Sequence, residues 1–409
     1  MDAIANAQHA LLILAGLLAA GSITAVLARR INVPDVALFL IAGVVLGPAG
    51  FGLIQVPANS TLNQFVLLLG ASWLLYDGGA GLRFAVLKKV WVTIVAISTL
   101  GVLITAFVTA FAAWWLLSVP WPIALLLGSV LAPTDPATLV PIFRHVRIRD
   151  RVSQTVISES AFNDATGAIL TLTLLGLVMA PGETPGAVGL LLSFTRDVAV
   201  GFGVGGAFGC AVAYLVAHER RGMLSDFAPA AALAGVIGAQ AVASALHGSG
   251  FMAVFVFGIV FGNRESLGLR LNPRATYHLE EFTTTCALIL RLLIFMLLGT
   301  QVDFALMSSV ALPAVLVVGV FMFVARPLTV LACAAPDRHA RWSRHELWFM
   351  CWTRETGVIP AALAGLLLGQ RVPGAETIAA VTFVAILMTI LIQAPTTYAV
   401  ARRLGLLAP

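Results

Sequence analysis

Charged residues are scarce in this chain. Only 11% of its 409 residues are Asp, Glu, Lys or Arg, and 60% are hydrophobic, whereas an average soluble domain is about 25% charged. The mean hydropathy is +0.98. A water-soluble fold cannot bury that share of apolar side chains, because surface area does not fall fast enough with size. The composition therefore excludes a soluble enzyme, a disordered chain and a disulfide scaffold, and it predicts a polytopic integral membrane protein.

Cysteine and alternating polar patterns are also scarce. The four cysteines lie in apolar stretches without metal-ligand spacing, so we interpret them as small core residues. The apolar runs are continuous and about 20 residues long, which favours helices over a β-barrel. No basic residue precedes the first run, 9–28, and Arg29 and Arg30 follow it. That order is the reverse of a signal peptide, so this run is predicted to be a membrane helix.

The apolar runs predict an all-α fold of about thirteen transmembrane helices. Their approximate ranges are 9–28, 34–52, 63–82, 90–117, 121–141, 153–179, 198–217, 227–246, 251–263, 282–300, 311–334, 347–370 and 378–400. Lys and Arg gather in alternate loops, which places the N-terminus outside and the C-terminus in the cytoplasm. The net charge of +5 thus reflects topology and not nucleic-acid binding. We expect a multi-pass protein of the cell inner membrane, formed by one membrane domain over 1–409, with no soluble regulatory domain.

Two predicted spans contain helix breakers near their centres. The fifth reads Pro133-Thr134-Asp135-Pro136, and the twelfth reads Arg354-Glu355-Thr356-Gly357 with Pro360 close behind. The spans are seven apart and run in opposite directions, which is typical of inverted repeats with two crossed discontinuous helices. An ordinary pair of proline kinks is the alternative. In crossed half-helices, Asp135 and Arg354 would compensate the partial charges at the helix ends.

The sixth span supplies a candidate ion site next to the first break. Ser160 and Asp164 lie four residues apart and share a helix face. Carboxylate, hydroxyl and carbonyl oxygens suit a small alkali cation, so we predict that Asp164, Ser160 and Thr134 bind Na⁺ or K⁺. Asn163 hydrogen-bonds but does not titrate. If only Asp164 changes charge, exchange of one proton for one cation is electroneutral.

Other charges within the spans require partners, because a charge at the bilayer centre costs at least about 2.5–3.5 kcal/mol. Arg326 is the candidate partner of Glu159, and we group Arg354 and Glu355 with them as structural charges. Asp77 ends the third span. It is either an outer ligand or proton relay of the ion site, or an interfacial carboxylate on a glycine turn.

These residues resemble the monovalent cation/proton antiporter-1 family, which includes bacterial NhaP-type sodium/proton antiporters and animal sodium/hydrogen exchangers. The motifs that carry the resemblance are Thr134-Asp135, Glu159-Ser160-Ala161-Phe162-Asn163-Asp164, Asp77-Gly78-Gly79, Arg326-Pro327 and Arg354. The resemblance implies a homodimer. It also implies a core, including 90–179 and 282–370, that moves like an elevator against scaffold helices from the remainder of the chain.

By the same resemblance, Asp164 is the ion- and proton-binding carboxylate, assisted by Ser160 and the Thr134 region, and Asn163 marks the electroneutral branch. The resemblance places Asp77 at an acidic position that is usually Glu in NhaP-type proteins. Many relatives read Arg-Gly where this chain has four residues, Arg354 to Gly357. Glu355 is therefore an extra carboxylate at the crossing.

The expected activity is electroneutral antiport of Na⁺ or Li⁺ against H⁺ by alternating access, which serves pH homeostasis. A K⁺/H⁺ antiporter on the same scaffold is the main alternative. A sodium-coupled symporter of organic solutes and an uncoupled channel or ion-regulated sensor also stay open. The expected partners are monovalent cations, protons, the lipid bilayer and a second copy of the chain. No cofactor and no nucleic acid are expected.

Overall fold

The computed structural model describes residues 3–31, 33–135, 148–179, 187–217 and 223–407. Helices dominate these residues, and the one β-bridge in them pairs Ile148 with Leu407. Eight helices of this part are long and apolar enough to cross a bilayer, and four more are apolar but only 10–17 residues long. The prediction of an all-α polytopic membrane protein is confirmed.

The first half of the chain forms the following helices. They are α1 (Ala3–Ile31), α2 (Asp35–Leu46), α3 (Thr61–Ala80), α4 (Phe84–Ala96), the π-helix η1 (Ile97–Gly101), α5 (Val102–Leu117), α6 (Trp121–Leu131), α8 (Asp150–Met179) and α9 (Ala187–Ala217). A kink at Val90 interrupts α4, and from there α4, η1 and α5 continue as one long span, Val90–Leu117.

The second half adds η2 (Ser225–Phe227), α10 (Ala228–Ala245), α11 (Gly250–Gly262), η3 (Arg264–Leu267), α12 (Pro273–Thr300), α13 (Phe304–Val320), the π-helix η4 (Phe321–Ala325), α14 (Arg326–Cys333), α15 (Arg344–Trp352), α16 (Val358–Gly369), α17 (Ala375–Met388), the π-helix η5 (Thr389–Gln393) and α18 (Ala394–Arg403). The predicted interruption of the twelfth span is present. α6 ends at Leu131, and α15 and α16 are separated by 353–357. The remainder of the predicted fifth span, 136–141, lies outside the described residues.

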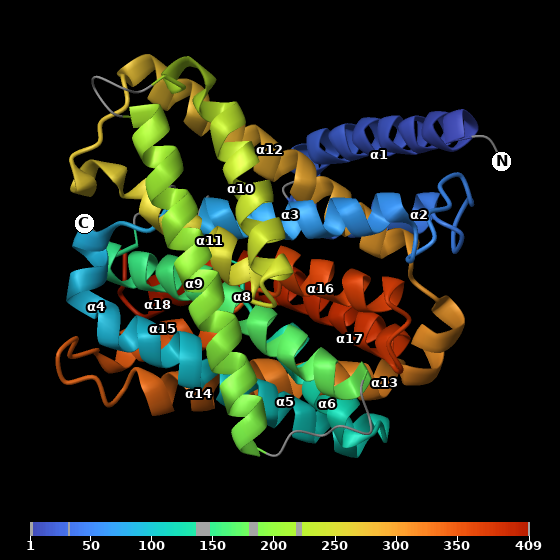
Figure 1. The fold of residues 1–409 in the computed structure, drawn as a ribbon. Coiled ribbons are helices and arrows are strands. Elements are labelled where there is room, and N and C mark those ends of the chain that lie inside the picture. Colours follow the sequence, from blue (N-terminus) through green and yellow to red (C-terminus); the bar gives the residue numbers. More distant parts are fainter. Residues whose placement is uncertain (1–2, 32, 136–147, 180–186, 218–222, 408–409) are drawn as a thin grey trace.

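The helices pack as two groups that meet along α12 and α16. In the first group α11 packs on α3 and α9, and α12 packs on α2 and α3. In the second α5 packs on α6 and α13, α6 on α8, and α13 on α17. α16 contacts both α3 and α12. Figure 1 shows α1 at the edge of the bundle, and only 11% of its most apolar 18-residue window is buried.

Glycine permits the closest helix contacts. A Cβ at Gly128 of α6 would lie 2.1 Å from the carbonyl oxygen of Ala106 in α5. A Cβ at Gly258 of α11 would lie 2.3 Å from the carbonyl oxygen of Tyr76 in α3. Without a side chain at these positions the backbones touch, as is typical of helix packing in membranes.

The loop between α14 and α15 is fixed to α4 by one carboxylate. Asp337 accepts hydrogen bonds from Thr93 Oγ1 at 2.5 Å and from the backbone N–H groups of His339 and Ala340 at 2.9 and 3.1 Å. Trp342 Nε1 donates to Thr93 Oγ1 at 2.8 Å. Burial alone would raise the pKa of Asp337, but these hydrogen bonds hold it below its ordinary value.

Candidate ion-binding site

The first chain break is held by two side chains of α8. Ser160 Oγ donates to the carbonyl oxygen of Thr134 at 2.5 Å. Asn163 Oδ1 accepts from the Thr134 backbone N–H at 3.0 Å, and Asn163 Nδ2 donates to Thr134 Oγ1 at 2.8 Å. Because α6 has ended, these backbone groups lack helical partners, and lipid cannot supply them. The predicted neighbourhood of Thr134, Ser160 and Asn163 is thus one hydrogen-bonded unit.

Asp164 follows Asn163 on α8 and is partly buried. Its Oδ1 atom is shielded from solvent and has no hydrogen-bond partner among the described residues. In the described part of the chain, no charged nitrogen of a Lys or Arg lies within 4.0 Å of the Asp164 carboxylate oxygens. Such an oxygen has its lone pairs available for a proton or a cation. Ser160 can contribute as well, because donating one hydrogen bond leaves the lone pairs of its oxygen free.

The two chain breaks contact each other through Asp135. Its backbone N–H donates to the carbonyl oxygen of Glu355 at 2.9 Å. Its Oδ2 atom accepts from the backbone N–H of Val358, at a long 3.4 Å, where α16 begins. A carboxylate at a helix N-terminus compensates the positive end of the helix dipole. A Cβ at Gly357 would lie 1.9 Å from the Asp135 Cβ, so only glycine fits here.

Arg354 lies at the opposite kind of helix end. Its Nη2 atom donates to the carbonyl oxygen of Ala132, just beyond α6, at 2.8 Å. The guanidinium also stacks 4.4 Å above the ring of Phe321 in η4. A cation at a helix C-terminus is favourable for the same electrostatic reason. Arg354 and Glu355 have no ion-pair partner within 4.0 Å among the described residues. In this they differ from Glu159 and Arg326, with which they were predicted to form the structural charges.

That pair, Glu159 and Arg326, is closed and buried. Each residue is 1% exposed, and the two groups make bidentate contact, with Arg326 Nη2 to Glu159 Oε2 at 3.0 Å. Arg326 also donates to the carbonyl oxygens of Met350 at 2.8 Å and Thr353 at 3.2 Å. The pair therefore joins α8 and α14 to the C-terminal end of α15.

Two residues that the sequence reasoning missed hold the second break. The backbone N–H of Thr356 donates to Thr389 Oγ1 at 3.0 Å, and Gln393 Nε2 donates to the carbonyl oxygen of Trp352 at 2.8 Å. Thr389 and Gln393 begin and end the π-helix η5 and are fully buried. The available signal was two polar residues four apart in an apolar span. Single π-helical turns are frequent at functional sites.

Asp77 lies in the last turn of α3, on the wall of a cavity of about 520 Å³ near the start of α12. The cavity also contains charged side chains, namely Arg83, Arg264, Glu265 and Glu280. Gly78 packs on α8, because a Cβ built on it would lie 3.5 Å from the Ala161 Cβ. This helix contact lies next to Asp77 on α3 and about one turn before Asp164 on α8. No contact is found between Asp77 and Asp164 themselves.

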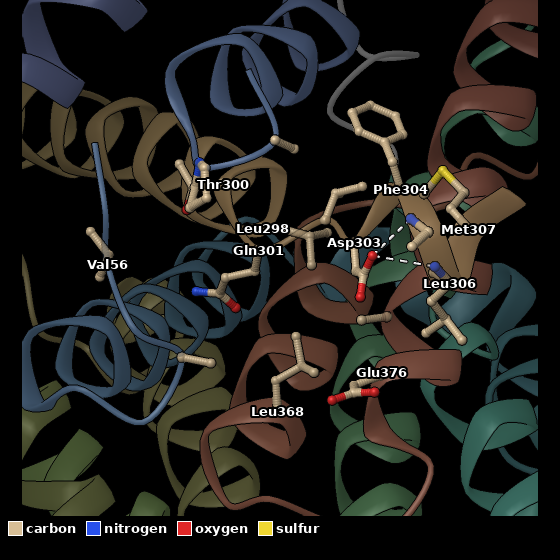
Figure 2. Close-up of a pocket in the computed structure, with 17 residues that line it drawn as sticks. Val56, Leu298, Thr300, Gln301, Asp303, Phe304, Leu306, Met307, Leu368 and Glu376 are labelled. Atoms are coloured by element: carbon tan, nitrogen blue, oxygen red, sulfur yellow. Dashed lines mark hydrogen bonds between the residues drawn. The ribbon is translucent and has the colours of Figure 1, made fainter. Parts of the chain in front are cut away.

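A second cavity, of about 630 Å³, lies at the other end of α12, between α13, α16 and α17. Figure 2 shows Asp303 and Glu376 on its walls. Asp303 Oδ1 accepts from the backbone N–H groups of Ala305 at 2.8 Å and Leu306 at 3.2 Å, which caps α13. Each end of α12 thus borders a hollow with acidic side chains.

Two chain breaks in contact with each other, beside a carboxylate oxygen that has no partner among the described residues, are typical of secondary transporters of small ions. The chain belongs to the sodium/hydrogen exchanger family, because the profile described as "Sodium/hydrogen exchanger, transmembrane" matches residues 16–403. The predicted membership of the cation/proton antiporter-1 family, NhaP type, is confirmed. This is a family of secondary transporters and not of enzymes.

Two curated relatives and one solved structure illustrate the similarity. The chain is 31% identical over 394 residues to the K⁺/H⁺ antiporter NhaP of Alkalimonas amylolytica. The alignment covers 95% of this chain and 65% of that protein. It is 29% identical over 350 residues to Na⁺/H⁺ antiporter 1 of Methanocaldococcus jannaschii, with 84% and 80% covered. The structure of the sodium proton antiporter MjNhaP1 from the same organism at pH 8 aligns with a TM-score of 0.84 and 26% identity, over 97% and 98% of the two chains. The chain thus spans about two thirds of the Alkalimonas protein's length.

Proposed function

We propose that this protein exchanges one monovalent cation for one proton across a membrane without moving net charge. The observation that carries the proposal is the shielded Oδ1 of Asp164 beside the chain break at Thr134, which has no hydrogen-bond partner in the described part of the chain. Asn163 occupies the neighbouring position with a neutral amide whose oxygen and nitrogen are both engaged. One titrating group therefore serves proton and cation in turn.

We further propose thirteen transmembrane spans, with the N-terminus outside and the C-terminus in the cytoplasm of the inner membrane. The two interrupted spans, α6 and α15–α16, are the crossed helices of inverted repeats. The mobile core comprises α4, α5, α6, α8 and α13–α18, and the remaining helices form the scaffold of a homodimer. The packing of α12 on α2 and α3 supports its place in the scaffold, although the sequence resemblance implied a core that includes 282–300.

In this topology the cavity at Asp77 opens toward the cytoplasm, and it is the proposed cytoplasmic entrance to the ion site. Asp164 loses its proton to this cavity and takes a cation, with Ser160 and the Thr134 carbonyl as further ligands. The neutral loaded core then moves, releases the cation outside and takes up a proton there. An empty, ionised Asp164 should not cross, because a bare charge in the bilayer interior costs at least about 2.5–3.5 kcal/mol.

The proposed cation is Na⁺, with Li⁺ as a substitute, in keeping with the structural relative named as a sodium proton antiporter. K⁺/H⁺ exchange is the second candidate, and the 31% identity to a protein named as a K⁺/H⁺ antiporter favours it. Both ions would use the same carboxylate, so the mechanism is common to the two candidates.

The test is Asp164→Asn in proteoliposomes with a pH-sensitive dye inside. Asparagine has nearly the same shape but binds no proton, so we expect cation-driven proton flux to disappear. Glu281→Gln, an exposed substitution on α12, is the matched control and should transport like the wild type. Unchanged exchange in Asp164→Asn would overturn the proposal, provided that both variants elute as the wild type does on size exclusion.

A further inference from the structure

Glu355 is a buried carboxylate that the mechanism above leaves unused. It lies in the segment between α15 and α16, where the two chain breaks cross, and it is 1% exposed. Its backbone carbonyl receives the Asp135 N–H, but its side-chain Oε1 has no hydrogen-bond partner among the described residues. The backbone N–H of the same residue bonds to the carboxylate, but no cation among the described residues does. A buried ionised carboxylate without a counterion is strongly disfavoured, whereas a neutral acid is tolerated.

The two neighbouring arginines bind other groups. Arg326 is bound by both oxygens of Glu159 and also donates to two carbonyls at the end of α15. Arg354 donates to the Ala132 carbonyl and stacks on Phe321. Neither guanidinium lies within 4.0 Å of the Glu355 carboxylate. Glu355 therefore has no counterion of its own in this part of the chain.

The charges of the crossing balance without Glu355. Among the described residues, the charged or titratable side chains close to the two chain breaks are Arg354, Asp135, Arg326, Glu159, Cys351 and Asp164. The face contributed by η5 is neutral, with Thr389 and Gln393. Among these described groups, the two arginines match Glu159 and Asp135 in number of charges, and Asp164 is neutral once it holds a proton or a cation. Ionised Glu355 would leave one negative charge uncompensated.

We propose that Glu355 is a second proton-binding site, which keeps its proton throughout the transport cycle and arrests the core when that proton is lost. The proposal rests on the proposed function, because the arrest follows from the same penalty that stops an empty Asp164 from crossing. The proton on Glu355 is not exchanged for a cation, so the stoichiometry stays one for one. Its loss at alkaline pH makes transport fall there, independently of competition at Asp164.

The first experiment compares the pH profile of Na⁺-driven and K⁺-driven proton flux in wild type, Glu355→Gln and the exposed control Glu281→Gln. Glutamine resembles the protonated acid but cannot ionise. At the alkaline end, where the wild type has declined, we expect Glu355→Gln to transport at least roughly tenfold faster than the wild type. The acidic limb, set by Asp164, should not move. The same alkaline decline in Glu355→Gln and wild type would overturn the proposal.

A second experiment needs no transport. In the Asp164→Asn background, infrared spectra recorded over a pH titration should show a protonated-carboxyl C=O band that vanishes at alkaline pH. Adding Glu355→Gln should remove that band. Identical spectra with and without Glu355→Gln would overturn the proposal, even if that variant folds poorly in liposomes. Absence of any cation/proton exchange in the wild type would instead defeat the proposed function, while the infrared comparison would still decide the state of Glu355.

Discussion

Replacing Arg326 with methionine should be far more damaging than replacing its partner. The substitution leaves the Glu159 carboxylate buried without a counterion, at a cost of about 3–5 kcal/mol. It also removes the donors to the carbonyls of Met350 and Thr353, at about 1 kcal/mol or more each. Glu159→Gln leaves Arg326 its two carbonyl acceptors and an amide oxygen, so the cost should be nearer 3 kcal/mol.

The assay is a double-mutant cycle on the apparent unfolding temperature in detergent. At roughly 2 °C per kcal/mol for a protein of this size, Arg326→Met should lose about 10–14 °C and Glu159→Gln about 6 °C. The double variant should recover part of the Arg326→Met loss, because no ionised carboxylate is then buried. Arg291→Met is the control. It breaks a partly exposed pair with Asp35 at 3.3 Å, so about 1 kcal/mol or less is at risk. Additive losses in the cycle would refute the reasoning.

Three further predictions follow from the same contacts. Asn163→Asp adds a second charge beside Asp164, so the exchange rate should become sensitive to membrane potential. Moving that charge across the membrane changes the free energy by about 2.3 kcal/mol per 100 mV. A flux that does not change under a potential clamp would contradict this prediction. Gly357→Ala forces Asp135 away from the chain break at Gly357, so cation-driven proton flux in liposomes should fall at least roughly tenfold. A flux equal to that of the wild type would show that the close contact between Gly357 and Asp135 is not required. The pKa of Asp337 is lowered on folding, so its carboxylate stabilises the fold above its unfolded pKa, and this stability is lost as pH falls through the folded pKa. Asp337→Asn should therefore lower the unfolding temperature at neutral pH, with a difference from wild type that shrinks in acid, and a pH-independent difference would argue against the charge.

The spans and the positions of the helix breakers could be predicted because both depend on residues that are close together in the sequence. A run of apolar residues and a proline in its centre need no knowledge of tertiary contacts. The ends were less accurate. α12 begins at Pro273 and not near 282, because its first turns are amphipathic and carry polar side chains. α2 ends at Leu46 and not near 52, because Gly47 and Pro48 directly after Leu46 stop the helix.

Side-chain partners were predictable only where few candidates existed. Glu159 and Arg326 are complementary charges deep in separate spans, so elimination suggested their pairing. The pair of Arg291 with Asp35 was not predicted, because Asp35 lies beside a loop and its sequence position does not indicate that it reaches α12. Thr389 accepts from the backbone N–H of Thr356 in the chain break, and Gln393 donates to the carbonyl oxygen of Trp352 at the end of α15. Such contacts depend on tertiary packing, which no spacing in the sequence encodes.

The central claim is best tested by measuring proton flux in proteoliposomes with Na⁺, Li⁺ or K⁺ added outside in turn, with and without a potential clamp. We predict that Na⁺ and Li⁺ drive proton movement and that the clamp leaves the rate unchanged. A response to K⁺ would select the second candidate ion on the same carboxylate. A clamp-sensitive rate would contradict electroneutral exchange at Asp164, and proton flux that no cation drives would contradict the antiport itself.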